Sequence, residues 1–281
     1  MFLDAYYCPQ TFCSTQDLAQ SWMRASRGDF KPLAKSKFSR ILVHGGGKGS
    51  AVYGEMAVFY TFSQQKGRGQ SGNVWFCGDG ANIAMSLAFC PPDLDAEVLF
   101  CLDMALSLGV LRYVRRINPD SCLKWPNDVY IGLRKLAGIL VETRIEGWRI
   151  AGICFGIGLN LNQLHFPDGL PNPVSFRQVD GVVRDLPQES LQLAMDVVES
   201  YTAFMDRYAS LGQEAGALFN LYKAEYLAAL LFYGQYRDYC FQNQRIQARM
   251  EDVDETGHLW LRNAHGKLFS AGIKELRYIL P

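Results

Sequence analysis

The sequence predicts an α/β (α+β) protein followed by a small β-barrel, and three observations support this fold class. Residues 1 to about 225 alternate between helical and strand-like hydrophobic patterns. The residues after Tyr233 are strand-like throughout and are separated by turn signals. The 281 residues, 49% of them hydrophobic, allow one sizeable and one small domain. We therefore expect an α/β domain over residues 1–230 and a barrel over residues 231–281.

The charge balance disfavours several classes of protein. The 28 basic and 28 acidic side chains cancel, which argues against disorder and against an overall charge suited to nucleic acid. The start of the chain has no basic segment followed by an apolar one, and the longest apolar stretch, near residues 227–233, is too short to cross a bilayer. We expect a cytoplasmic protein that does not enter a membrane.

Cysteines and histidines give little support for a metal centre. The eight cysteines show no C-x-x-C spacing, and several lie in apolar runs, so we expect reduced thiols. The four histidines form no ligand-like cluster, so neither a zinc site nor a histidine-based triad is expected.

The first predicted helix begins near Ser14. Ser14 and Asp17 fit the capping pattern of a helix start, and Leu18 and Trp22 follow at helical spacing. The string His44–Ser50 resembles a phosphate-binding loop but breaks its residue order, because Gly49 separates Lys48 from the serine. We expect a surface loop there.

A glycine loop, which we define as residues Gly67–Gly72, comes next. Three glycines in six positions let the backbone approach a ligand and point N–H groups at it, which suits phosphate or carboxylate. A surface turn is the alternative for such a loop taken alone. Trp75 follows it and is expected in a binding pocket, whereas Trp125 is expected in the core.

The segment Lys124–Leu140 is the most informative part of the chain. Residues 123–131 read as a buried strand, residues 132–134 as a tight turn and residues 136–141 as the returning strand. This hairpin would carry Lys124, Asp128 and Lys135 to one rim. Charges on buried elements need partners, and an anion is the natural partner of two lysines. A salt bridge between Asp128 and either lysine is the alternative.

The remaining elements complete the two parts. Gly156 and Gly158 lie in an apolar strand, where they permit close approach of a ring or mark a β-bulge. Residues 189–227 are rich in helical pattern and would pack on the main sheet. Leu259 and Leu261 alternate with polar neighbours, as in a half-buried strand.

Three motifs resemble those of the biotin protein ligases. They are Gln64–Trp75, the pair Lys124–Asp128 and Lys135–Leu140, and Gly156–Asn162, and they occur in the order typical of that family. The resemblance implies a mixed, mostly antiparallel sheet flanked by helices, of the class II aminoacyl-tRNA-synthetase-like type, and an SH3-like C-terminal barrel. Nothing before Tyr7 leaves space for a helix-turn-helix module, so nucleic acid is not an expected partner.

The resemblance also implies an activity: formation of biotinyl-5′-AMP from biotin and ATP with release of pyrophosphate, then transfer of biotin to a lysine. ATP and Mg²⁺ are the implied cofactors, and the implied partner is a biotin carboxyl carrier domain of a carboxylase. The sequence leaves open whether the protein is a monomer or a homodimer. A lipoate or octanoate ligase or transferase, and a catalytically silent biotin-binding protein, are the alternatives.

The site residues divide by expected role. The catalytic residues are Lys135, Asp128, Lys124 and Arg68. The biotin-binding residues are Ser14, Thr15, Gln16, Gln64, Arg68, Gly69, Gln70, Lys135 and Gly138. The adenylate-binding residues are Gly67, Gly69, Trp75, Lys124, Asn127 and Asn160. Many family members have a second arginine where Gln70 stands and an asparagine where Gln16 stands.

Overall fold

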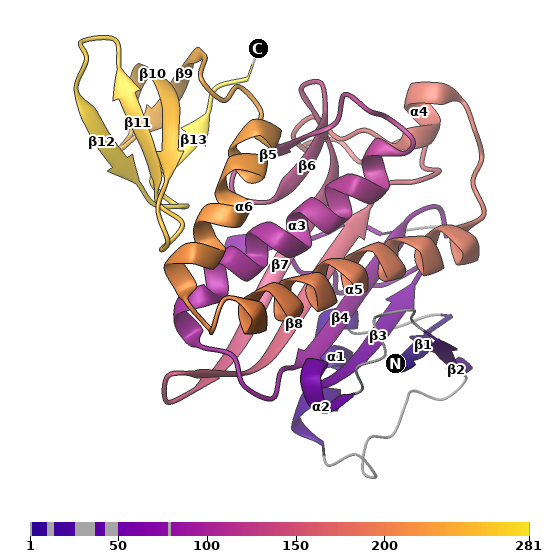
Figure 1. The fold of residues 1–281 in the computed structure, drawn as a ribbon. Coiled ribbons are helices and arrows are strands. Elements are labelled where there is room, and N and C mark those ends of the chain that lie inside the picture. The colour runs from indigo at the N-terminus through magenta and orange to yellow at the C-terminus, as the bar shows by residue number, and fades with distance from the viewer. Residues whose placement is uncertain (1, 10–13, 26–36, 43–49, 78–79, 281) are drawn as a thin grey trace.

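The computed structural model describes residues 2–9, 14–25, 37–42, 50–77 and 80–280, and two sheets organise them (Figure 1). The larger sheet has the strand order β2-β1-β3-β4-β8-β7-β6-β5. Its strands are β1 (Phe2–Tyr7), β2 (Lys37–Leu42), β3 (Glu55–Thr61), β4 (Ile83–Cys90), β5 (Cys122–Lys124), β6 (Asp128–Ile131), β7 (Arg134–Glu146) and β8 (Arg149–Leu159). Only the β1–β3 pairing is parallel among the pairings of these strands, which confirms the mixed, mostly antiparallel sheet.

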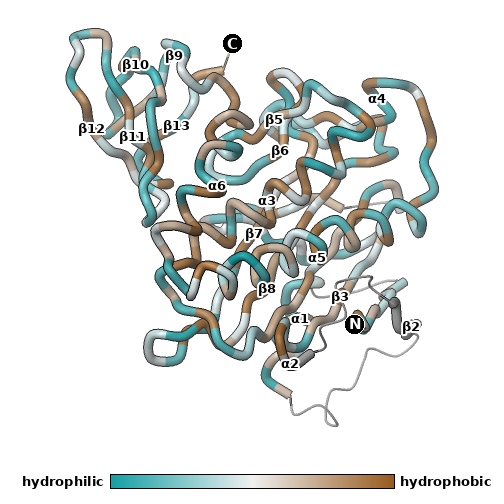
Figure 2. Tube along the Cα trace, viewed as in Figure 1, coloured by the Kyte–Doolittle hydropathy of each residue, from teal (hydrophilic) through white to brown (hydrophobic). Residues whose placement is uncertain are grey.

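Helices cover both faces of this sheet. The α-helices are α1 (Thr15–Arg24), α2 (Ser50–Tyr53), α3 (Leu99–Arg115), α4 (Phe176–Asp180), α5 (Leu186–Ser210) and α6 (Ala215–Ala229), with 3-10 turns η1 (Gln70–Gly72) and η2 (Ala96–Val98). The long helices α3 and α5 lie side by side across one face (Figure 1). Helix α3 is apolar almost all round, so it becomes the centre of the core, as the brown run in Figure 2 shows.

Helix α1 packs on the opposite face of the sheet. Successive side chains of a strand point to opposite faces, so Val58 and Leu87 join the core under α3 and α5 while Ala57 and Ala88 contact α1. Ala19 of α1 is fully buried against the second set. This packing places the N-terminus of α1 against the middle strands of the sheet, where the candidate site lies.

The predicted hairpin differs from the structure in one respect. The turn at residues 132–133 is confirmed, with Gly132 at φ +57°, and β6 pairs with β7. The single strand predicted over residues 123–131 is wrong: the chain turns back at Pro126, so that Lys124 of β5 lies opposite Asp128 of β6. Proline has no N–H to give to a strand ladder, which favours a turn at this point.

The C-terminal strands form a separate sheet, as the tail pattern predicted. They are β9 (Tyr236–Phe241), β10 (Gln244–Val253), β11 (Leu259–Asn263), β12 (Leu268–Ala271) and β13 (Leu276–Tyr278). The order β12-β11-β10-β9-β13 places β12 and β13 at the two edges. The structure thus shows a five-stranded antiparallel sheet, and a closed SH3-like barrel stays a prediction.

Some further expectations can be compared with the structure. Residues 43–49, which include most of the glycine-rich string near His44, lie outside the described residues. The cysteines within the described part of the chain are free thiols, and Cys8, Cys77, Cys101 and Cys154 are buried. None of the helices in the described ranges is long and apolar enough to cross a membrane.

Candidate active site

A pocket of about 260 Å³ lies between the glycine loop, the N-terminus of α1 and strands β4, β7 and β8. Most residues predicted for the site line it: Ser14, Thr15, Gln16, Gln64, Arg68, Gly69, Gln70, Trp75, Lys124, Asp128, Lys135 and Gly138. Three predicted residues lie beside it instead: Gly67, Asn127 and Asn160. The three motifs, far apart in sequence, therefore converge on one cavity.

Its buried end is polar, and we call the side chains of Thr15, Gln16 and Ser86 the polar end. The Thr15 and Ser86 hydroxyl oxygens lie 2.8 Å apart, and Ser86 also donates to Gln16 Oε1 over 3.0 Å. The Nε2 atom of Gln16 donates to the carbonyls of Leu140 and Cys154, so this amide is held by the protein itself. Thr15 and Ser86 are thus the hydroxyls best placed to meet a polar ligand group.

Helix α1 positions this end of the pocket through its cap. The Ser14 hydroxyl accepts a hydrogen bond from the Asp17 N–H, and the Asp17 carboxylate accepts one from the Ser14 N–H. Both bonds belong to the predicted capping pattern. Gln64 accepts from the Thr15 N–H through Oε1 over 3.2 Å. The cap fixes the first turn of the helix, and Gln64 joins it to the segment between β3 and the glycine loop.

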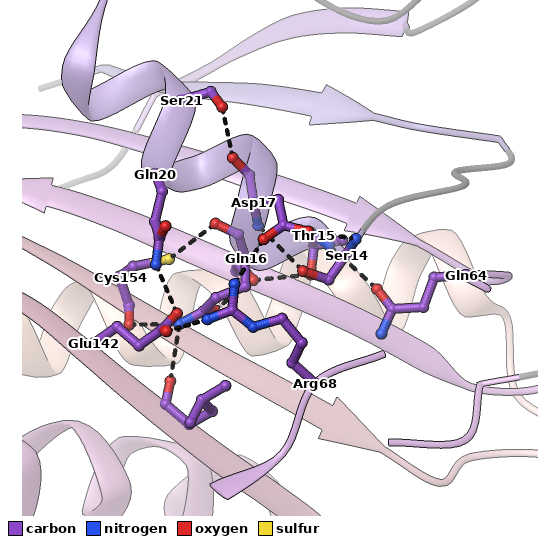
Figure 3. A network of polar contacts seen from close by, with 12 residues as sticks. Ser14, Thr15, Gln16, Asp17, Gln20, Ser21, Gln64, Arg68, Glu142 and Cys154 are labelled. Carbon is purple, nitrogen blue, oxygen red and sulfur yellow. Dashed lines mark hydrogen bonds and ion pairs between the residues drawn. The ribbon is translucent and has the colours of Figure 1, made fainter. Parts of the chain in front are cut away.

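Arg68 is held by two carboxylates, which the sequence did not predict (Figure 3). Its guanidinium contacts Asp17 over 2.6 Å and also pairs with Glu142. Burial alone would raise the pKa of Asp17, but hydrogen bonds from Ser14 and the pairing with Arg68 hold it below its ordinary value. Arg68 thus ties the glycine loop to α1 and β7, rather than standing as a free cation.

Trp75 forms one wall of the pocket by lying on glycines. A Cβ atom on Gly158 would come within 2.0 Å of the Trp75 indole, and one on Gly138 would come within 3.0 Å. The strands β4, β7 and β8 keep a regular register past Gly156 and Gly158, so a β-bulge does not explain these glycines. The ring of Trp75 approaches Gly158 closely, whereas the nearest neighbour of a Cβ on Gly156 would be the side-chain oxygen of Gln16.

Lys124, Asp128 and Lys135 lie on the same rim, as predicted. Lys135 Nζ is 2.6 Å from Asp128 Oδ2, so the salt bridge that was the alternative interpretation of Asp128 is present, and it lies within the candidate site. Burial, together with Lys135, lowers the pKa of Lys124, while Asp128 opposes that shift. Tyr278 of the C-terminal sheet places its ring 4.8 Å from Lys124 Nζ, so the second sheet also helps to position this lysine.

A second cavity, of about 400 Å³, adjoins the first across Trp75 and Lys135, which line both. Asn160 belongs to this cavity, together with apolar side chains that sequence reasoning did not single out, among them Val74, Phe76 and Phe166. The Asn160 side chain donates to the Val174 carbonyl over 3.1 Å. The pair of cavities provides a polar compartment and an apolar one with a lysine between them.

Several contributing residues were missed. Ser86, Asp103 and Glu142 were not selected. Ser86 and Asp103 interrupt the apolar runs of β4 and α3, and a polar residue in such a run usually has a specific role, so this signal would have found them. Glu142 follows the apolar run of β7 and has polar neighbours, so it carried no such signal. Tyr278 had no such signal, because its contact depends on how the second sheet meets β5.

The described residues contain no group of three or more His, Cys, Asp or Glu side chains that could hold a metal ion. Magnesium commonly binds through substrate phosphates and one or two carboxylates rather than in an all-protein cage. The expected Mg²⁺ therefore stays a prediction tied to the nucleotide.

The mixed sheet, the glycine loop over a pocket, and the two lysines and one aspartate at its rim define an α/β protein with a candidate ligand-binding pocket. Residues 51–160 match the model of the biotin/lipoate A/B protein ligase family. The bifunctional ligase/repressor BirA of Escherichia coli (strain K12) is 34% identical over 110 residues, which are 39% of this chain and 34% of BirA. The biotin--[acetyl-CoA-carboxylase] ligase of Paracoccus denitrificans is 32% identical over 52% of this chain and 62% of that protein.

A solved structure is similar over the whole chain. The biotin protein ligase from Aquifex aeolicus in complex with biotin and ATP superposes with a TM-score of 0.69 and 20% identity, covering 98% of this chain and 99% of the other. At this identity the comparison shows the fold. The sequence matches to the first curated relatives span only about a third of their length, between 31% and 37%.

Proposed function

We propose that this protein is an ATP-dependent biotin protein ligase. It would activate biotin as biotinyl-5′-AMP with release of pyrophosphate and then transfer biotin to a lysine of a carrier domain. The single observation that carries the proposal is the convergence of Lys124, Asp128, Lys135 and the glycine loop on one pocket with a polar buried end. The named relatives and the family match support the same assignment.

The two cavities fit the two parts of the proposed intermediate. The hydroxyls of Thr15 and Ser86 suit the ureido group of biotin, which offers both N–H donors and a carbonyl acceptor. The apolar cavity beyond Trp75, where Phe76 and Phe166 lie, suits an adenine ring. Lys135 lines both cavities, which places its charge near the bond that would join the two parts.

In the first step, a biotin carboxylate oxygen attacks the α-phosphorus of ATP, and the bond from that phosphorus to the pyrophosphate oxygen breaks. Two anions must approach each other, so fixed positive charge lowers the barrier. Lys124 and Lys135 supply that charge, and the amides of the glycine loop add donors. Mg²⁺, bound to the phosphates of ATP, would neutralise further charge on the leaving group.

In the second step, the neutral ε-amine of the carrier lysine attacks the carbonyl carbon of the mixed anhydride, and AMP leaves. The proton lost from the amine needs an acceptor. Asp128 is the carboxylate at the rim of the pocket. Because Lys135 binds its Oδ2, its Oδ1 would accept the proton from the amine.

The test is a coupled assay on the full chain. ATP with biotin should release pyrophosphate, and subsequent addition of a biotin carboxyl carrier domain should yield a labelled lysine. Pyrophosphate release with lipoate or octanoate but not with biotin would show instead that the protein is a lipoate or octanoate ligase. Tight biotin binding without any pyrophosphate would identify a silent binding protein.

The polar end favours biotin over a fatty acyl substrate. An octanoyl chain would offer the Thr15 and Ser86 hydroxyls no polar group beyond the bonds that they make to each other and to Gln16, and unused hydrogen-bonding capacity in a buried site costs binding free energy.

A further inference from the structure

A chain of three side chains links helix α3 to the glycine loop. Asp103 of α3 accepts from Asn127 Nδ2 through both carboxylate oxygens, each over 3.2 Å. Asn127 Oδ1 in turn accepts from Gln70 Nε2 over 3.0 Å. Gln70 Nε2 also donates to the carbonyl of Ile139 on β7 over 3.3 Å. These contacts connect the core side of the sheet with the loop over the pocket.

The direction of this chain is set by Asp103. An ionised carboxylate only accepts hydrogen bonds, so the amide of Asn127 must turn its nitrogen toward Asp103 and its oxygen toward the loop. That oxygen can bind only a donor, so it selects the nitrogen of Gln70. The Ile139 carbonyl imposes the same orientation on Gln70. One carboxylate thereby fixes the orientation of two amides.

We propose that Asp103 is a positioning residue that holds the glycine loop over the pocket by orienting Asn127, which holds Gln70. This gives a role to Gln70, where the resembled family commonly has an arginine: the residue serves as a neutral tether of the loop. The inference goes beyond the proposed function, because it concerns the loop before any ligand binds.

The surroundings of Asp103 support a specific role. Helix α3 is otherwise apolar up to its basic last turn, and a carboxylate within such a helix is unfavourable unless it is used. Ser107, one turn later, donates to Asp103 over 3.4 Å, and Asn127 itself is only 3% exposed. A buried amide with one fixed orientation is suited to transmitting that orientation to its next partner.

The loop has a second tether, which makes the effect measurable and partial. Arg68 pairs with Asp17 and Glu142, while Gln70 is bound to Asn127 and Ile139. Loss of the Asp103 chain should therefore loosen the loop without releasing it.

The experiment is hydrogen exchange, followed by mass spectrometry, on the full chain without ligand. The amides of Gly69, Asn73 and Trp75 donate hydrogen bonds that close the glycine loop against the residues that follow it, and their exchange reports its opening. In Asp103→Asn, which removes one of the two acceptor oxygens, they should exchange about threefold to tenfold faster than in the wild type, as expected for the loss of one hydrogen bond. Asp103→Ala should do the same or more.

Glu97→Gln is the matched control. Glu97 lines the same cavity as Asp103, so its substitution removes a negative charge there without touching Asn127. It should leave exchange in the loop unchanged. Equal acceleration in Glu97→Gln and Asp103→Asn would overturn the inference, because the effect would then come from net charge.

A double-mutant cycle tests the linkage itself. Gln70→Ala should accelerate exchange like Asp103→Asn, and the double variant should be no faster than the faster single one. The linkage from Asp103 through Asn127 to Gln70 would be refuted if the accelerations of the two single variants multiplied in the double variant. It would also be refuted if Asp103→Asn exchanged at the wild-type rate. A merely structural role of Asp103 would lower the melting temperature without acting on the loop selectively.

The outcome is separable from that of the proposed function. Wild-type protein that releases no pyrophosphate with biotin and ATP would refute the function, whereas exchange in the ligand-free loop would still decide the role of Asp103. If the ligase proposal holds, Asp103→Asn should also release biotin about threefold to tenfold faster than the wild type, consistent with the same lost bonds. If biotin release were unchanged although the loop amides exchanged faster, Asp103 would hold the loop only in the ligand-free protein. That result would refute a role for Asp103 in retaining bound biotin.

Discussion

Lys135 Nζ lies 2.6 Å from Asp128 Oδ2, so the two residues to which we assign different steps are bound to each other at the rim of the pocket. Both lie on the β6–β7 hairpin, with Lys135 opposite Tyr130 and therefore close to Asp128. The ion pair fixes the position of both side chains at the rim. A change to either residue therefore acts on both, and only separate measurement of the two steps can divide their roles.

Lys135→Ala should slow pyrophosphate release from biotin and ATP by about 10² to 10³-fold, the range found when one preorganised charge or donor is removed from a reacting centre. Asp128→Asn should retain pyrophosphate release within roughly tenfold and lose most of the transfer to the carrier lysine, because general-base contributions lie near 10²–10⁴. Arg134→Ala, an exposed neighbour on the same hairpin, is the control. Normal pyrophosphate release by Lys135→Ala would remove its assignment.

Glu142→Gln should loosen the glycine loop by weakening its tether through Arg68. Biotin should dissociate a few-fold faster, since a partly exposed ion pair contributes about 1 kcal/mol or less. Raised salt should reduce the difference between variant and wild type, because it screens the pair that only the wild type has. Glu146→Gln on the same strand, whose pair with Arg144 is 3.5 Å long and exposed, is the control. Stopped-flow fluorescence measures the rates, and equal rates in all three proteins would contradict the tether.

The sequence was sufficient for the mixed, mostly antiparallel sheet, for the strand-rich C-terminal segment and for most of the residues that line the pocket. Residues within one short motif, such as Lys124 and Asp128, are close in sequence, so local structure is enough to bring them to the same pocket. The tie between Arg68 and Glu142 was not predictable, because it depends on how far the glycine loop folds over β7. Asp103 was missed for a similar reason: the turn at Pro126, which brings Asn127 to it, was read as a continuous strand.

Gly158→Ala adds only a methyl group, but it should change the shape of the pocket substantially. The added Cβ would lie 2.0 Å from the Trp75 indole, so the ring must leave the wall that it shares between the two cavities. We expect biotin affinity to fall by roughly tenfold or more, with overpacking costing about 1–3 kcal/mol of folding stability. Titration calorimetry measures the affinity, and Trp75 fluorescence reports the displacement. Gly216→Ala, where a Cβ meets no atom within 4 Å, is the control.

Asp103 should give the wild type a distinctive dependence of stability on pH. Burial raises its pKa to about 6 from an ordinary 3.8, although the bonds from Asn127 and Ser107 lower it. The charged groups that line the same cavity are the carboxylates of Glu97 and Glu255, which do not favour ionisation of Asp103.

The sign of the effect follows from the raised value. The folded protein takes up a proton at Asp103 as the pH falls through about 6, whereas the unfolded chain does so only near 3.8. Protonation therefore favours the folded state over this window, and the ionised carboxylate costs stability above it. Asp103→Asn cannot titrate there, so the free energy of unfolding of the wild type relative to this variant should rise as the pH falls from 7 to 5. Urea unfolding at several pH values measures it, and a difference that is constant with pH would show that Asp103 is not desolvated in the folded protein.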